Sequence, residues 1–256
     1  MSLALNHKKR LLEQGPIADP KPYTSATALA GPANAQKHLA LMNASLAEDC
    51  GRLSELNSLE ARQRLKRDEL LPKYLVYVQR YRESGLNHPN LVLMQVLVWL
   101  FDTEQFEQAL ELADFAIEQG QAMPERFRRD IPTFVGDTMV EWAEAQHKAQ
   151  RNPEPYLSQL LLRVDGQWPG HRDPLDGDPR ELPAPAASWE LFEKIPARYH
   201  KLLGILAMED KCWAKACAHF YRANELYPEI GVKTRMDEAS KALRKQEADG
   251  DKSGTE

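Results

Sequence analysis

The residues best suited to metal chemistry form an acidic group in the second half of the chain, consisting of Asp165, His171, Asp173, Asp176 and Asp178. Carboxylates this close together could bind Mg²⁺ and stabilise the attacking and leaving oxygens of phosphodiester hydrolysis. The surrounding stretch, residues 165–185, contains five prolines and three glycines. Because metal catalysis needs rigidly held ligands, a solvated loop is the simpler interpretation. We therefore predict no metal site and no cofactor.

Basic residues gather near the N-terminus, although the whole chain has a net charge of -5. Residues 1–82 contain 13 Lys and Arg against 8 Asp and Glu, whereas the remainder contains 20 against 30. Lys and Arg on a helix and an adjoining arm can neutralise phosphates and release counterions. The predicted DNA contacts are Lys8, Lys9, Arg10, Arg62, Arg64, Lys66, Arg67, Lys73, Arg80 and Arg82. A solvated helix face is the alternative for Arg62 to Arg67.

A second basic patch consists of Arg126, Arg128 and Arg129, and its flanking acids Glu125 and Asp130 could pair with it. Other chemistry has less support. The sequence has no Walker-type phosphate loop, no H-E-x-x-H motif and no nucleophile elbow, so no catalytic residue is predicted. The three cysteines lack a CxxC pair and are interpreted as reduced apolar fillers; they are Cys50, Cys212 and Cys217.

The elements that would position these residues are helices. Residues 1–31 are punctuated by prolines and predict a loose arm. From Ala33 to Arg67 an apolar stripe predicts either one long amphipathic helix or a helical hairpin broken near Gly51, with Asp49 in a seam position. An exposed seam of this length would favour self-association.

Further apolar periodicities predict helices along most of the remaining chain. They begin near Asp68, with Pro72 in the first turn, and continue at Asn87–Phe101, Phe106–Glu118, Phe134–Gln150, Pro155–Val164, Ser188–Ala207, Lys211–Leu226 and Pro228–Ala248. No apolar run is long enough to span a membrane, and the expected location is the host cytoplasm.

The segment Leu203–Pro228 has the spacing of a tetratricopeptide helix pair, carried by Leu203, Gly204, Ala216, Phe220, Ala223 and Pro228. His200 and Ala207 stand where that pattern favours aromatic residues. Generic tight packing of helices through alanine is the alternative. Under either interpretation the predicted fold class is all-α, a long N-terminal helix or hairpin followed by a tetratricopeptide-like array of antiparallel helices.

Several segments together resemble a known family. They are Asp68–Pro72 with Tyr74–Val78, Leu93–Leu100 followed by Asp102-Thr103, Ala109–Ala113, and Gln121–Pro124 followed by Arg128-Arg129. In this order and spacing, over roughly residues 39–150, the chain resembles the small terminase subunit of temperate, contractile-tailed phages with cohesive DNA ends. The Pro-rich stretch near 165–185 and the acidic tail after Gln246 depart from the family pattern.

The resemblance implies a protein that recognises the cohesive-end site on double-stranded viral DNA. It also implies a homo-oligomer, a ring, that recruits the large terminase subunit with its ATPase and nuclease. The family is sometimes labelled an endonuclease, but the residues favour a targeting role. Two alternatives stay open: a metal-dependent endonuclease using the loop aspartates, and a tetratricopeptide-like scaffold that binds proteins and not DNA.

The predicted organisation follows from these observations. Its parts are a basic, Pro-rich arm (1–31), a basic helical region for DNA binding and oligomerisation (32–82), a helical core (83–164), a Pro/Gly-rich loop (165–186), a tetratricopeptide-like pair with a C-terminal helix (187–248) and a polar tail (249–256).

Overall fold

A computed structural model describes Thr24, Ala28 and residues 32–166 and 189–253 of the chain. These residues form helices joined by short connections, and none of them lies in a β-strand. The prediction of an all-α fold is confirmed. The chain divides into two compact units, Met1–Arg126 and Phe127–Glu256. No helix within the described ranges is long and apolar enough to cross a bilayer.

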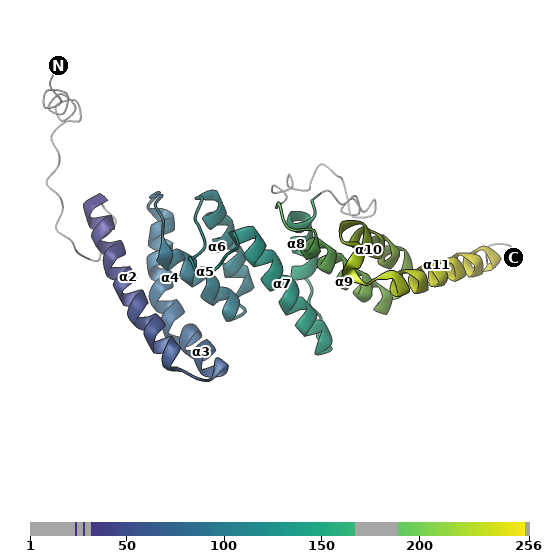
Figure 1. Cartoon of the computed structure of the whole chain (residues 1–256), viewed down its shortest axis with the longest axis horizontal. Helices are drawn as coiled ribbons and strands as arrows, with labels where there is room; N and C mark the ends of the chain where they lie inside the picture. The colour runs from purple at the N-terminus through teal and green to yellow at the C-terminus, as the bar shows by residue number, and fades with distance from the viewer. Residues whose placement is uncertain (1–23, 25–27, 29–31, 167–188, 254–256) are drawn as a thin grey trace, which may run out of the picture. The chain divides into compact units, whose positions relative to one another are not determined.

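The first unit is built around one apolar helix (Figure 1). Its elements are α2 (Pro32–Glu55), α3 (Leu59–Leu65), the π-helical segment η1 (Lys66–Leu70), α4 (Leu71–Glu83), α5 (Leu91–Asp102) and α6 (Phe106–Glu118). Every side chain from Val92 to Phe101 in α5 is buried. A helix that is apolar all round must be enclosed by others, and α2, α4 and α6 pack against it.

The N-terminal stripe folds as a hairpin, but the break lies at residues 56–58 and not near Gly51, where the hairpin alternative placed it. Gly51 remains helical within α2, and the chain leaves the helix only at residues 56–58. Ser58 then starts α3, because its Oγ accepts a hydrogen bond from the Ala61 N–H at 3.3 Å. The apolar seam residues Leu46 and Leu53 are buried within the chain itself, so the seam does not require a second copy to cover it.

The two arms of this hairpin run antiparallel. Arg52 of α2 contacts Glu69, and the ring of His38, further back along α2, lies 5.3 Å from the ring of Tyr77 in α4, at a tilt of 56°. Residues earlier in α2 thus contact residues later in the run from α3 to α4, as in an antiparallel pair. The fold therefore brings α2 alongside the helical run from α3 to α4.

The helical run Leu59–Glu83 is continuous, whereas the sequence predicted a new helix near Asp68. Pro72 would ordinarily disrupt a helix that continues through it, because it lacks an N–H and its ring crowds the carbonyl one turn back. The wider π turn of η1 accommodates the proline, and in this turn the Leu71 N–H donates to the Lys66 carbonyl. The proline thus widens the helix without ending it.

The second unit is organised around a close helix pair. Its elements are α7 (Ile131–Lys148), α8 (Tyr156–Val164), α9 (Lys194–Glu209), α10 (Trp213–Leu226), the 3₁₀ turn η3 (Pro228–Ile230) and α11 (Lys233–Ser253). Helix α9 begins six residues after the predicted start at Ser188. A Cβ added at Gly204 of α9 would lie 2.6 Å from a ring carbon of Phe220 in α10.

Small residues therefore let α9 and α10 approach closely, as their spacing predicts. The core between α9, α10 and α11 includes Ala197, Ala207, Ala216, Cys217, Phe220, Ala223, Ile230, Val232 and Ala239. Generic alanine packing would produce the same contacts. The assignment to the tetratricopeptide class stays a prediction.

Candidate nucleic-acid interface

The predicted DNA contacts lie mainly on the continuous helical run Leu59–Glu83. Lys8, Lys9 and Arg10 lie outside the described residues. The run itself contains seven Lys and Arg against four Asp and Glu. Its basic residues do not share one face, and the structure separates them by what their side chains contact.

Arg64 and Arg67 face the solvent. The side chain of Arg64 is 70% exposed and lies 3.4 Å from Glu60, one turn earlier on the same helix. Arg67 is exposed in η1, and within the described part of the chain it forms no ion pair. An exposed pair such as Arg64–Glu60 exchanges readily with water, so both guanidinium groups are accessible to an anionic ligand.

Arg62 and Lys66 instead help to hold the helices together. The Arg62 Nε donates to the Leu56 carbonyl at 2.6 Å and so satisfies an acceptor at the end of α2. The Lys66 ammonium lies 2.7 Å from a carboxylate oxygen of Asp102, and its side chain is only 13% exposed. These two cations have structural partners, which the sequence did not indicate.

Lys73 is bound to a buried carboxylate. Its Nζ donates to Asp49 Oδ2 at 2.6 Å, and the Tyr74 hydroxyl donates to the same oxygen at 2.7 Å. Burial by itself raises the pKa of Asp49, but hydrogen bonds from Lys73, Tyr74 and Arg52 outweigh it and the pKa is lowered. Asp49 does occupy the predicted seam position, where these three partners stabilise its charge.

Arg80 and Arg82 lie toward the end of α4. The Arg82 guanidinium lies 5.5 Å from the centre of the Phe115 ring, a cation–π contact with α6. Arg80 is exposed. The pKa of His38 in α2 is lowered, mainly because the His38 ring is partly buried and secondly because the positive charge of Arg80 is nearby. Arg80 therefore belongs to the outer surface formed by α2 and α4.

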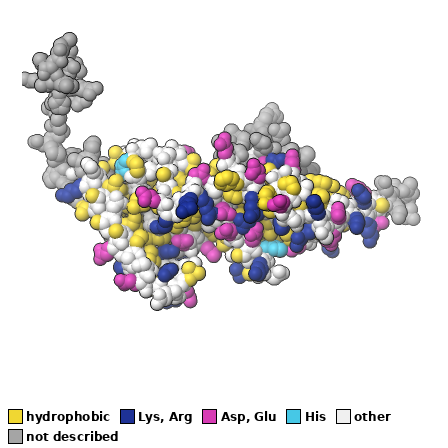
Figure 2. All heavy atoms as spheres, viewed as in Figure 1, with side chains coloured by type: hydrophobic (Ala, Val, Ile, Leu, Met, Phe, Trp, Pro, Cys, Tyr) yellow, Lys and Arg dark blue, Asp and Glu magenta, His cyan; other side chains and the backbone are white. Residues whose placement is uncertain are grey.

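The surface around α3 is mixed in charge. Figure 2 shows Lys and Arg side chains interspersed with Asp and Glu side chains at this end of the first unit. A groove of about 440 Å³ runs between the end of α2 and α3, lined by Arg52, Glu55, Leu56, Ala61, Arg64, Leu65, Asp68 and Glu69. Arg52 was missed by the sequence analysis, although its place in the last turn of α2 beside the basic run could have indicated it.

The second basic patch divides between the two units. Arg126 belongs to the first unit and donates to Oε1 of the buried Gln95 at 2.7 Å. Arg129, in the second unit, forms an ion pair with Asp137. The flanking Asp130 instead caps α7, since its Oδ1 accepts a hydrogen bond from the Thr133 N–H at 2.9 Å. Arg128 is exposed, and the role of these arginines as a basic patch stays a prediction.

The acidic group is only partly described, because His171, Asp173, Asp176 and Asp178 lie outside the described residues. Asp165 is buried and accepts two hydrogen bonds from Arg222, at 2.6 and 2.9 Å. It also lies 3.1 Å from His200 Nε2. Across the described ranges, no three His, Cys, Asp or Glu side chains are grouped so as to hold a metal ion.

Comparison with known proteins places this arrangement in context. The chain matches the phage small terminase subunit family over residues 43–172, just over half of its length. It is 35% identical over 132 residues to the "Probable terminase, endonuclease subunit" of Haemophilus phage HP1 (strain HP1c1), which covers 52% of this chain and 47% of that protein. The aligned part therefore spans about half of the HP1 relative.

A second relative aligns over a longer stretch. The chain is 28% identical over 203 residues to the "Terminase, endonuclease subunit" of Escherichia phage P2, covering 79% of this chain and 73% of that protein. No solved structure matches the chain. The family match includes the whole basic run Leu59–Glu83 and α5 to α8. The chain therefore belongs to the phage small terminase subunit family.

Proposed function

We propose that this chain selects viral DNA for packaging, by binding the cohesive-end site and recruiting the large terminase subunit. One observation carries the DNA-binding part. Within the family-matching region, the helical run Leu59–Glu83 has three more basic than acidic residues, and two of its arginines, Arg64 and Arg67, point to solvent. Such side chains can contact phosphates, whereas the cations paired with Asp49 and Asp102 are committed to the fold.

The test neutralises only the exposed arginines. Arg64→Gln with Arg67→Gln leaves the contacts of Arg62 and Lys66 in place, so the helices should keep their packing. Each phosphate contact contributes about 0.9 to the slope of log affinity against log salt. We expect the double variant to lower that slope by about 2. The measurement is a titration of a fluorescent cohesive-end duplex at several salt concentrations.

A matched control removes the same charge elsewhere. Arg235→Gln with Lys241→Gln changes two exposed cations on α11 in the second unit. We expect this variant to keep the wild-type slope. If both variants change the slope equally, binding follows net charge alone and α3 with η1 is not the DNA surface.

Assembly is the second part of the proposal, and it rests on the family resemblance. We propose a homo-oligomeric ring that encounters DNA through the surface formed by α3 and η1. Native mass spectrometry of the full chain, with and without its DNA, measures the number of copies directly. A monomer at micromolar concentration in both conditions would contradict the ring.

An intrinsic endonuclease activity is a second candidate, favoured by the names of both relatives. Asp173 and Asp176 are the carboxylates that we would test, because Asp165 is already bound by Arg222 and His200. The assay incubates purified chain with cohesive-end DNA and Mg²⁺. Cutting that is lost in Asp173→Ala with Asp176→Ala supports this candidate, and cutting that survives places the activity elsewhere.

A further inference from the structure

The second unit contains a cleft at the start of α7, and two of its lining residues, Arg128 and Arg129, belong to the second predicted basic patch. Its volume is about 650 Å³, and it is lined by Arg128, Arg129, Asp130, Thr133, Asp137, Glu141, Phe192, Lys194, Ile195 and Arg198. These residues come from α7, α9 and the segment before each helix. Pockets of this volume accommodate a few side chains and are far narrower than a DNA duplex.

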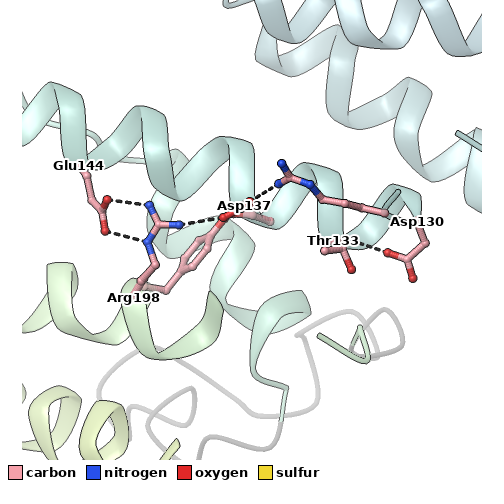
Figure 3. Close-up of polar contacts among 8 residues, drawn as sticks. Asp130, Thr133, Asp137, Glu144 and Arg198 are labelled. Atoms are coloured by element: carbon pink, nitrogen blue, oxygen red, sulfur yellow. Dashed lines mark hydrogen bonds and ion pairs between the residues drawn. The ribbon is translucent and has the colours of Figure 1, made fainter. Parts of the chain in front are cut away.

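One wall of the cleft is held rigidly by ion pairs (Figure 3). Arg198 of α9 lies between two carboxylates of α7, at 2.7 Å from Glu144 and 2.8 Å from Asp137. Arg129 pairs with the same Asp137. Tyr199, the next residue on α9, donates from its hydroxyl to the Gly136 carbonyl at 3.0 Å. These charges satisfy one another, so they shape the cleft more than they attract a ligand.

The remaining side chains of the cleft are open to a partner. Phe192 is 74% exposed, the largest exposed fraction among the large apolar side chains described. Its neighbour Leu191 packs against α7: a Cβ added at Gly136 would lie 3.2 Å from the Leu191 Cδ1. The backbone that presents Phe192 is thereby anchored. Aromatic side chains, Phe among them, are enriched at protein–protein interfaces relative to the rest of the protein surface.

The charges at the rim favour an acidic partner segment. Arg128 and Lys194 are both exposed, and neither forms an ion pair with any described residue. Among the acids that line the cleft, Asp137 is paired with Arg129 and Arg198, and Asp130 caps α7. A protein segment can place one carboxylate between Arg128 and Lys194 and keep other groups clear of the acids.

We propose that this cleft docks a segment of the large terminase subunit that carries a carboxylate beside an apolar or aromatic side chain. The inference rests on the recruitment part of the proposed function and assigns it a surface. Phe192 and Ile195 contact the apolar side chain, and Lys194 with Arg128 binds the carboxylate. The occupant is a protein segment, since a cleft of about 650 Å³ accommodates a few side chains and cannot enclose a DNA duplex.

The experiment titrates purified large subunit onto the immobilised full-length chain. Phe192→Ser and Lys194→Glu are the test variants, and both side chains are exposed, so the fold should tolerate their loss. Tyr221→Ser and Lys148→Glu are the matched controls; Tyr221 is 57% exposed on α10, and Lys148 is exposed at the end of α7. We expect each test variant to weaken binding at least tenfold and each control to stay within twofold of wild type.

Three results would overturn the docking site. Test variants that bind the large subunit like wild type leave the proposed function standing but remove this surface. Variants that lose DNA retention, or change the mass of the assembly, and still bind the large subunit assign the cleft to nucleic acid or to a second copy. A wild-type chain that does not bind the large subunit removes the recruitment part of the proposed function, and the docking site with it.

Discussion

Two aspartates are buried among the described residues, Asp49 in the first unit and Asp165 in the second, and their partners differ in access to water. The two cations that contact Asp49 are about half exposed to solvent, since the side chains of Arg52 and Lys73 are 47% and 46% exposed. The partners of Asp165 are more enclosed: the side chain of Arg222 is 18% exposed and that of His200 is 0% exposed. A buried carboxylate matters most where its partners cannot return to water without it.

The network around Asp165 also extends further than that around Asp49. His200 Nδ1 lies 2.9 Å from Nδ1 of the buried His219, so the two rings share one hydrogen bond. Only one of two facing nitrogens can supply the hydrogen, and a second proton there would oppose the first. A chain of contacts that begins at Asp165 thus joins α9 to α10, whereas the contacts of Asp49 end at exposed side chains and one tyrosine.

The largest effect is expected for Asp165→Ala. The change leaves His200 without its acceptor and Arg222 without two hydrogen bonds, so we expect a loss of about 3–5 kcal/mol in the stability of the second unit. Hydrogen exchange of the α9 and α10 amides measures this unit by itself. Asp210→Ala, at an exposed position just after α9, is the control and should leave exchange unchanged. A loss below about 1 kcal/mol would contradict the importance of enclosed partners.

Asp49→Ala should cost less, about 1–3 kcal/mol. Arg52 and Lys73 can turn toward water, and the main cost is the hydroxyl of Tyr74, which is fully buried. Exchange of the α2 and α4 amides is the measurement, with the exposed Asp68→Ala as the control. If Asp49→Ala destabilises the first unit as much as Asp165→Ala destabilises the second, the solvent exposure of the partners does not explain the difference between the two sites.

Acid should weaken both sites, and Asp165 more. The pKa of each carboxyl is lowered in the folded chain, because hydrogen bonds from side-chain partners outweigh the opposing effect of burial, and the lowering is larger for Asp165. A lowered pKa adds stability that is complete above the ordinary value of 3.8 and is lost as the pH falls below it.

Stability measured by hydrogen exchange or urea unfolding, between about pH 5 and pH 2.5, tests this sign, since that range brackets the unfolded carboxyl pKa. We expect Asp165→Asn to flatten the acid dependence of the second unit by at least about 1 kcal/mol relative to wild type. Asp49→Asn should flatten that of the first unit by less. A steeper loss in either amide variant would reverse the sign and contradict the assignment of these carboxyls as charged in the fold.

Much of the fold could be predicted from the sequence, because it depends on local periodicity. The spacing of apolar residues placed α6 at Phe106–Glu118 as observed, and it placed Asp49 in the seam of α2. The apolar run around Leu91–Phe101 likewise predicted the helix that became α5. The effect of Pro72 could not be predicted in this way. A proline in a helical pattern can either end the helix or widen it, and the surrounding packing decides which.

The candidate site was harder to predict, because it depends on contacts between distant residues. Arg62 and Lys66 fit the basic pattern as well as Arg64 and Arg67 do, yet their partners, Leu56 and Asp102, become visible only in the fold. Asp165 similarly meets Arg222 far along the chain. Charge pattern identifies cations; it does not reveal which are already neutralised.

The smallest effect is expected for the exposed pair Arg64–Glu60, which sharpens the contrast with both buried aspartates. The two side chains are 70% and 83% exposed, so water replaces the contact when it is removed. We expect Arg64→Ala to change stability by less than about 0.5 kcal/mol, measured by exchange of the α3 amides. Glu60→Ala is its matched control and should behave alike. A larger loss would mean that Arg64, like Arg62, supports the fold, and any effect of Arg64 on DNA binding could then no longer be separated from its effect on helix packing.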